Sequence, residues 1–416
     1  MSKLEAFKQE MAAGGSVVER DPDERPDPMT AVLGIGAWVA LFIVLAAVNV
    51  WFVVFVGGIL VSVFLHEVGH FWTARRSGMK VTQFFMGFGP RIWSFHRNGI
   101  EYGLRAIPLG AFVRIIGMNN LDEVPPEDEP VTYRQQSFPK RLLVISAGSL
   151  MHMLIAIVLV TGVYAGVGRF EESGRVVVAE SVDSGTPAGI AGIQRGDQLV
   201  EIDGHRLTKA EQMSDLLGSI APGTLIEVVV VRDGVEMVLP ATLTQRPGTD
   251  APRGFLGVST QSVDRVEKSL PEAFGIGSVD LVRGLGQSVE GVVKVINPVN
   301  VAGHLFGTNE DPTSRPTTLV GATRLSDNVG TFDGWGGVLL LLAMVNLSVG
   351  VFNMFPLLPL DGGHAAVAVY ERIRSRRGRR YFADVAKLMP VVSITIAVLA
   401  FMFLTGLYLD IAKPIQ

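Results

Sequence analysis

The pattern of apolar and polar stretches divides the chain into membrane-like and water-facing parts. No charged residue occurs from Thr30 to Leu65. One helix running on from there to His70 would be about 60 Å long at about 1.5 Å per residue, twice the hydrocarbon thickness of about 30 Å. We therefore predict one or two transmembrane spans in residues 30–70, most simply two that turn near Asn49. Residues 1–29 are polar and acidic, unlike the start of a signal peptide, and predict a flexible cytoplasmic tail.

Later apolar stretches predict three more spans, at residues 142–168, 336–363 and 388–410. Lysine and arginine gather between residues 75 and 141 and again between 371 and 380, so the positive-inside rule places both segments in the cytoplasm. Residues 71–141 then form a membrane-associated region, and 364–387 form a basic loop. Holding the membrane by binding anionic lipid is the weaker interpretation of that loop.

Two segments have the pattern of strands. Residues 81–117 are rich in aromatic and β-branched residues, and Asn98-Gly99 predicts a hairpin turn between them. A second hairpin, in residues 224–243, turns at Asp233-Gly234 and follows a short strand and an amphipathic helix. Residues 248–335 are less clear, although 270–296 have helical apolar spacing.

These patterns predict a polytopic α-helical membrane protein of about four to five spans. It has a membrane-associated β-hairpin region and an inserted extracytoplasmic α+β domain at residues 174–247. The composition agrees: of 416 residues, 48% are hydrophobic and 18% charged, and the mean hydropathy is +0.36. The net charge of −4 argues against nucleic acid as a partner. The chain has no cysteine, so any metal ligands must be histidine, aspartate or glutamate.

The clearest chemical motif is His-Glu-Val-Gly-His at residues 66–70. On a helix, His66 and His70 lie on one face, with Cβ atoms roughly 5–6 Å apart. Two imidazoles can therefore bind one Zn²⁺, which in catalytic sites has three protein ligands and a water molecule. Glu67 is then placed to act as the general base for that water. The alternative is a pair of core histidines with Glu67 in a salt bridge, but ionisable residues in an apolar span are costly and usually functional.

The order of the spans brings Asp361 to the cytoplasmic end of its segment, at the same depth as His66 and His70. A carboxylate there can complete a site of two histidines and one aspartate. Pro356 and Pro359 interrupt the helix in front of it. The alternative for Asp361 is a turn or helix-capping residue, because Asp-Gly is a common turn dipeptide.

Two other polar residues of the predicted spans have roles that the pattern leaves open. Asn353 can donate a hydrogen bond to the substrate backbone or to the oxyanion formed on attack. His152 is a lone polar residue in the 142–168 span, and such residues are more often packing or hydrogen-bonding residues than ligands.

Residues 184–204 resemble the PDZ domains of bacterial membrane and periplasmic proteases, which bind peptide ends by strand addition. The HExxH motif, the later N-x-x-P-x-x-P-L-D-G motif and the PDZ domain between them resemble the site-2 protease family of intramembrane zinc metalloproteases. The match is to the PDZ-containing type represented by the bacterial sigma-E regulator protease, and the chain looks actinobacterial.

The resemblance implies that His66, His70 and Asp361 bind zinc and that Glu67 is the catalytic base. It also implies that the β-region and Asn353 contact the substrate, through a set of residues made up of Asn353, Gly87, Gly89, Leu109 and Gly110. The expected substrate is a transmembrane protein, such as an anti-sigma factor after a first cleavage outside the membrane. The PDZ domain would bind a peptide end or exclude bulky outer domains. The protein would lie in the cell inner or plasma membrane, in contact with lipid, with its active site near the cytoplasmic face.

Some residues depart from that family's pattern. Relatives usually have A-G-P-x-x-N after the β-region, whereas this chain has Ser149 and His152 at the last two distinctive positions. Many relatives have an asparagine five residues before Asn353, where this chain has Ser348, with Asn346 two residues earlier. None of these changes affects a predicted ligand or the base. The alternative function is a catalytically idle, zinc-containing membrane chaperone or PDZ adaptor.

Overall fold

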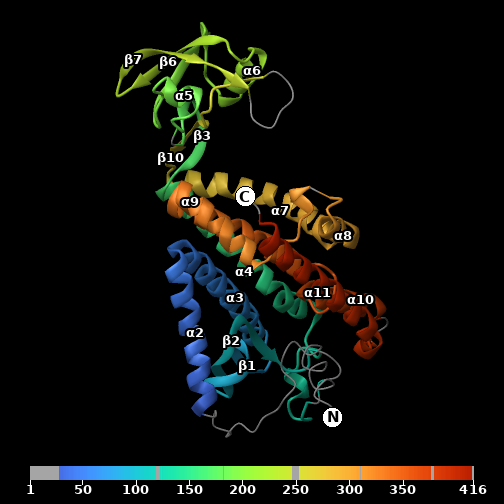
Figure 1. Cartoon of the computed structure of the whole chain (residues 1–416). Coiled ribbons are helices and arrows are strands. Elements are labelled where there is room, and N and C mark those ends of the chain that lie inside the picture. Colours follow the sequence, from blue (N-terminus) through green and yellow to red (C-terminus); the bar gives the residue numbers. More distant parts are fainter. Residues whose placement is uncertain are drawn as a thin grey trace. The chain divides into compact units, whose positions relative to one another are not determined.

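The computed structural model describes residues 28–118, 122, 124–180, 182–245, 253–309, 311–375 and 379–414 (Figure 1). The chain forms two compact units, one of residues 164–269 and one of the remaining residues on either side. Most of the predicted tail, residues 1–27, lies outside the described residues.

In the described part of the larger unit, five helices are long and apolar enough to cross a membrane. They are α2 (Pro28–Val48), α3 (Val50–Arg76), α4 (Phe138–Gly166), α9 (Leu319–Asn353) and α11 (Met389–Ala412). The predicted turn near Asn49 is present: this residue lies between α2 and α3, and its side chain accepts a hydrogen bond from the Trp51 backbone N–H at 2.8 Å. Asn49 thus caps the N-terminus of α3, and the continuous apolar run is divided at this residue into two helices.

Helix α9 corrects the bounds of the span predicted at residues 336–363. It begins at Leu319, well before the predicted span, and Thr318 caps it through its side chain. The polar residues before Gly334 concealed this first part, and Asp327 there accepts a hydrogen bond from the Asn49 amide at 2.5 Å. Helix α9 kinks at Gly334, whose φ of 63° is left-handed. It ends at Asn353, so residues 354–360 are not part of the span.

The basic segment predicted as a loop at 364–387 is also corrected, because its first part belongs to helix α10 (Asp361–Arg374). Ala365, Ala368 and Glu371 are buried and recur every third residue, so they form one face of α10 that packs inward. A short 3-10 helix, η3 (Val385–Leu388), precedes α11. The other 3-10 turns are η1 (Glu129–Val131) and η2 (Pro312–Ser314).

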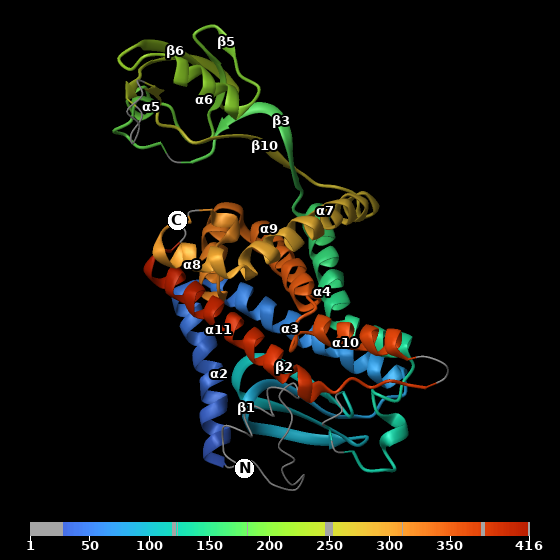
Figure 2. The same cartoon turned by 90° about the vertical axis from the view of Figure 1, so that its right-hand side faces the viewer.

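The membrane-associated region is a long hairpin of β1 (Val81–Arg97) and β2 (Ile100–Ile115). Asn98 and Gly99 form its turn as predicted, both with positive φ. Phe85 of β1 lies opposite both Gly103 and Phe112 of β2, so this part of β1 has a segment of β2 on each side. Helix α2 packs against the hairpin (Figure 2), and the Trp38 indole donates a hydrogen bond to the Arg105 carbonyl at 3.0 Å.

The predicted amphipathic segment is helix α7 (Leu270–Ile296), followed by α8 (Pro298–Phe306). Gly277 and Gly284 let α7 approach the long helices closely. A Cβ on Gly277 would lie 3.0 Å from Val160 of α4, and one on Gly284 would lie 2.8 Å from Leu347 of α9. Other apolar residues of α7, such as Phe274, stay exposed.

The smaller unit contains a six-stranded antiparallel sheet in the order β10-β3-β4-β6-β7, with β5 paired to β4. Its strands are β3 (Arg169–Val178), β4 (Gln198–Ile202), β5 (His205–Arg206), β6 (Leu225–Arg232), β7 (Val235–Thr242) and β10 (Thr260–Val266). Helices α5 (Pro187–Ile190) and α6 (Ala210–Ser219) and a small pair, β8 (Thr244–Gln245) with β9 (Gly254–Phe255), complete it. The predicted β6–β7 turn at Asp233-Gly234 is present.

The core of this unit is a cluster of buried aliphatic side chains from the sheet and α6, including Leu199, Ile226 and Val228. One buried ion pair lies beside it: Asp197 receives two hydrogen bonds of 2.7 Å from Arg232. Burial by itself would raise the pKa of the Asp197 carboxyl. The hydrogen bonds from Arg232 and from the Gln194 backbone N–H outweigh that effect, and the pKa lies below its usual value.

Candidate metal centre and its surroundings

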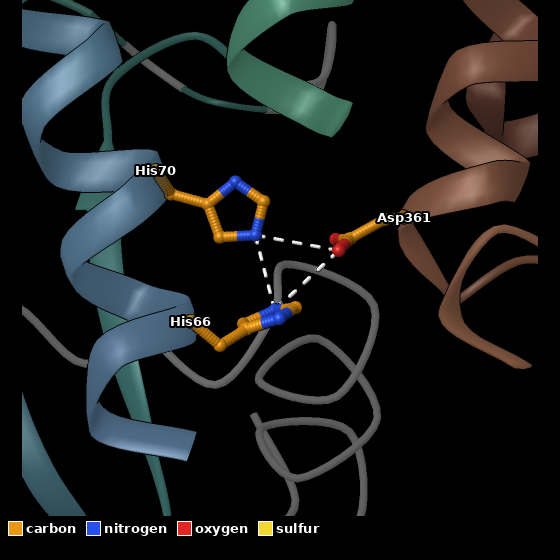
Figure 3. Close-up of side chains that lie close together, drawn as sticks. All are labelled: His66, His70 and Asp361. Carbon is orange, nitrogen blue, oxygen red and sulfur yellow. Dashed lines mark hydrogen bonds and ion pairs between the residues drawn. The ribbon is translucent and has the colours of Figure 1, made fainter. Parts of the chain in front are cut away.

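Two imidazoles of α3 form the first half of the site. His66 and His70 are both buried, and their four-residue spacing on the helix brings their Nε2 atoms to 3.1 Å from each other. Figure 3 shows the two rings projecting from the same side of α3. The Nδ1 atom of His70 lies 2.7 Å from the Val144 carbonyl oxygen of α4. Donation to that oxygen fixes the tautomer in which Nε2 carries a free lone pair.

Asp361 comes from the other end of the sequence and completes the cluster. Its Oδ2 lies 3.5 Å from Nε2 of His66 and 3.3 Å from Nε2 of His70 (Figure 3). The two glycines after Asp361 make this placement possible. A Cβ on Gly363 would lie 2.6–2.8 Å from backbone atoms of Leu357 and Leu358, and one on Gly362 would collide with Met354. The chain therefore folds tightly under the non-helical segment at the point where α10 begins.

The cluster fits a tetrahedral metal ion. Its three ligand atoms lie 3.1, 3.3 and 3.5 Å from one another. Zinc bound at about 2.0–2.1 Å in a regular tetrahedron requires ligand atoms about 3.3–3.4 Å apart. Oδ2 of Asp361 is buried and has no hydrogen-bond partner among the described residues, as expected of an atom that binds a cation. The sequence prediction that these three residues come together is met by this geometry.

Glu67 lies next to the cluster without joining it. Its Oε1 is 3.9 Å from Nε2 of His66, and its side chain is mostly buried. The group of side chains that can share one ion contains His66, His70 and Asp361 but not Glu67. The Glu67 carboxylate also has a hydrogen bond with the backbone of Val113 in β2. A carboxylate beside the ligands and in contact with a strand can reach both a water molecule and a peptide on that strand.

Gly148 closes the opposite side of the site. Helix α4 passes so near that a Cβ on Gly148 would collide with both imidazoles. The same crossing brings Gly69 of α3 against α4, where an added Cβ would lie 2.7 Å from the Ala147 carbonyl oxygen. In the sequence, Ala147-Gly148 is recognisable only as the start of the family's A-G-P-x-x-N motif. Its role as a wall of the site depends on how the two helices cross.

His152 is a buried hydrogen-bonding residue and not part of the ligand group, as the sequence favoured. Its Nδ1 lies 2.8 Å from Oδ1 of Asn346, and its ring centroid lies 5.0 Å from that of His66. The Asn346 amide donates to Ser62 Oγ at 3.1 Å and to the Leu342 carbonyl at 2.8 Å. All three polar residues are almost fully buried. The histidine that departs from the family motif thus pairs with Asn346, which the sequence analysis mentioned only as displaced from its expected place.

The predicted substrate-contacting residues lie on helix α9 and on the two strands of the hairpin. Asn353 is the last residue of α9, and residues 354–360 separate it from Asp361. Gly87, Gly89 and Gly110 have positive φ values and lie within the hairpin, as does Leu109. A Cβ on Gly87 would lie 2.7 Å from the Ile107 carbonyl oxygen, which explains that glycine as a requirement of strand packing. The contact of these residues with a substrate stays a prediction.

Comparison with known proteins agrees with this site. The family model described as peptidase family M50 matches residues 54–399. The zinc metalloprotease Rip1 of Mycolicibacterium smegmatis is 34% identical over 402 residues, covering 88% of this chain and 98% of Rip1. Rip1 of Mycobacterium tuberculosis is 33% identical over 400 residues, with the same coverage. These relatives and the ligand cluster identify Zn²⁺ as the cofactor.

Among solved structures, the PDZ domain of the SdrC-like protein from Listeria monocytogenes is similar to part of the chain. It is 20% identical, covers 22% of this chain and 92% of its own, and has a TM-score of 0.19.

Proposed function

We propose that this chain, which belongs to peptidase family M50, is an intramembrane zinc protease that hydrolyses a peptide bond in or near the membrane-spanning segment of a single-span protein. The observation that carries the proposal is the position of the metal cluster with Glu67. The cluster is formed by one of the five long apolar helices and the first residue of α10, which follows a second such helix. Three buried ionisable groups at such a position require a function that offsets their cost.

In the proposed reaction each group of the chain has one task. When bound, zinc polarises the scissile carbonyl and lowers the pKa of water toward about 7. His66, His70 and Asp361 hold it and leave one side open. Glu67 accepts the proton of the attacking water and transfers it to the leaving nitrogen. A structural zinc site would instead be closed by four protein ligands and would need no base, which argues against the idle chaperone or adaptor.

The substrate backbone is proposed to lie along β2. A peptide bond inside a membrane helix is protected by its own hydrogen bonds, so the substrate must be extended before it is cut. Support for β2 comes from the contact between Glu67 and the Val113 backbone, which links this strand to the predicted base. Strand addition beside Val113 would place a substrate backbone next to Glu67. Asn353 and the residues Gly87, Gly89, Leu109 and Gly110 would border the same path.

We further propose the orientation and the partners. In the proposed orientation the metal site lies near the cytoplasmic face of the cell's inner or plasma membrane, and the basic residues at the ends of α3 and α10 support it through the positive-inside rule. The smaller unit, proposed as a PDZ domain, would then lie outside. It would bind peptide ends or exclude substrates with bulky outer domains. The substrate class that fits is a transmembrane protein, such as an anti-sigma factor, already shortened by another protease.

The central test compares the intact wild-type protein with Glu67→Gln in liposomes that contain a truncated single-span substrate. We expect cleavage only by the wild type, with equal zinc content in both proteins, because glutamine cannot accept the proton. Glu127→Gln is the matched control, since Glu127 is exposed in the segment before α4. Equal cleavage by Glu67→Gln, or no cleavage of any such substrate by the wild type, would contradict the proposal.

The strand proposal has its own test. Val113→Pro removes the backbone N–H beside Glu67, whereas Val113→Ala keeps it. We expect Val113→Pro to lose cleavage while it keeps its zinc, and Val113→Ala to retain most of its activity. Equal rates for both variants would exclude substrate addition at this part of β2.

A further inference from the structure

A cavity of about 360 Å³ lies away from the metal ligands, where the start of α4 meets the end of α10. Its lining comes from the residues just before and in the first turn of α4, from the last turn of α10, and from the segment after α10. Four of the lining side chains are arginines: Arg134, Arg141, Arg372 and Arg380. The hydrogen bond from Lys140 Nζ to the Ser77 carbonyl, 3.0 Å long, places the start of α4 beside the end of α3. The cavity is therefore at the end of two membrane helices.

Two of the four arginine charges are balanced within the protein. Arg141 donates to Oε2 of Glu371 at 2.7 Å. The other oxygen of Glu371 accepts a hydrogen bond of 2.7 Å from the Ala383 backbone, and the single negative charge of this carboxylate is already matched by Arg141. Arg134 is paired with Glu129, at 2.5 Å from Oε2 and 2.8 Å from Oε1.

The other two arginines carry charge without a carboxylate partner. Among the described residues, no carboxylate lies within ion-pair distance of Arg372 or Arg380. Within the described part of the chain, Arg380 donates to Gln135, at 2.9 Å from its backbone oxygen and 3.5 Å from its side-chain oxygen. Counted over the described residues, the lining of the cavity therefore has an excess of about two positive charges.

Two more features of the cavity favour an anion. The side chain of Arg141 is 8% exposed, and its buried Nε has no hydrogen-bond partner in the described part of the chain. Phe138 begins the 29-residue helix α4, so the partial positive charge of that helix terminus lies at the cavity wall. Planar guanidinium groups with free N–H donors suit phosphate oxygens in particular.

We propose that this cavity binds a phosphate-bearing anion, whose source is the headgroup of an anionic phospholipid or free phosphate in solution. The anion would bridge Arg372, in the last turn of α10, and Arg380, in the segment after α10, to the start of α4. These two helices also carry parts of the metal centre, Asp361 at the other end of α10 and Gly148 of α4. A bound anion therefore stabilises the packing of two elements on which the site depends.

The test uses the intact protein in nanodiscs of phosphatidylcholine alone, of phosphatidylcholine with phosphatidylglycerol, or of phosphatidylcholine with inorganic phosphate in the buffer at constant ionic strength. Thermal unfolding and native mass spectrometry report stabilisation and bound lipid. For the wild type we expect a higher Tm in nanodiscs with phosphatidylglycerol than in phosphatidylcholine alone. We also expect phosphatidylglycerol to stay bound in native mass spectrometry. For Arg372→Gln/Arg380→Gln we expect at least tenfold weaker retention and no gain in Tm.

The control Arg97→Gln/Arg379→Gln removes the same charge at exposed residues outside the cavity and should behave as the wild type does. A Tm gain with phosphatidylglycerol alone identifies lipid as the source, and a gain with inorganic phosphate identifies the free anion. The proposal is overturned if neither anion raises the Tm of the wild type. It is also overturned if the two double variants lose the same amount of lipid retention and of Tm gain. Zinc content, measured in every variant, shows that each is folded.

Discussion

A single methyl group at Gly148 tests the proposed metal centre most directly. Gly148 lies on α4 against both imidazoles, and a Cβ there would lie 2.6 Å from His66 Nδ1 and closer still to His70 Nε2. Ordinary van der Waals contact begins at 3.4 Å, so His66 or the helix would have to move by at least about 3.4 − 2.6 = 0.8 Å, and by more to clear Cε1 of His66, which lies closer than Nδ1. Metal–ligand distances tolerate only about 0.2 Å. The displacement is about four times that tolerance.

Retreat of α4 would relieve this collision only by disturbing the packing beside it. Val144 and Ile145, one turn earlier on α4, are fully buried, and the Val144 carbonyl orients His70. Loss of a group that orients a metal ligand typically weakens metal binding by about 10–100-fold. We expect Gly148→Ala to reach the upper end of this range, about 2.7 kcal/mol, because both histidines are displaced.

The assay is zinc affinity of the intact purified protein, measured against a competing chelator, together with cleavage of the single-span substrate. Gly162→Ala is the matched control, because Gly162 is on the same helix and a Cβ there would meet nothing within 4 Å. The control should bind zinc and cut as the wild type does. Unchanged zinc affinity in Gly148→Ala would refute the reasoning, because it would mean that the imidazoles are not held where the structure places them.

Three further predictions concern single polar residues. Asp361→Ala should lose its zinc, because His66 and His70 alone cannot hold the ion. Metal analysis after dialysis against a mild chelator would detect this loss, and full retention of zinc would contradict a three-ligand site. His152→Leu should cost about 1–3 kcal/mol of stability by leaving the Asn346 amide oxygen buried and unpaired. His152→Asn should recover part of that loss in thermal unfolding, and equal Tm values for the two variants argue against the pair. Because Arg232 lowers the pKa of Asp197, the ion pair stabilises the folded state above the unfolded pKa of about 3.9 and is lost as pH falls through the lower folded value. Asp197→Asn should therefore reduce hydrogen-exchange protection of β4 and β6 at neutral pH but progressively less below about pH 4, and a difference independent of pH contradicts this.

Local signals in the sequence predicted much of the chain. The capping residue Asn49, the Asn98-Gly99 and Asp233-Gly234 turns and the spacing of residues 270–296 act within a few residues of themselves, so their structures match the predictions. Prediction was wrong where polar residues acquire distant partners. Asp327 belongs to a membrane helix because Asn49 pairs with it, and Glu371 is part of a helix because Arg141 does.

The sequence by itself determined the chemistry of the metal centre. Helical spacing places His66 and His70 on one face, and the order of spans predicted that Asp361 reaches the same depth, where it can complete the site. Only the tertiary structure decided what surrounds these residues. Gly148 as a wall, the pairing of His152 with Asn346, and the cavity with Arg372 and Arg380 all depend on where helices far apart in the sequence cross. A helix repeat fixes which side chains share a face, but packing between helices sets which faces meet.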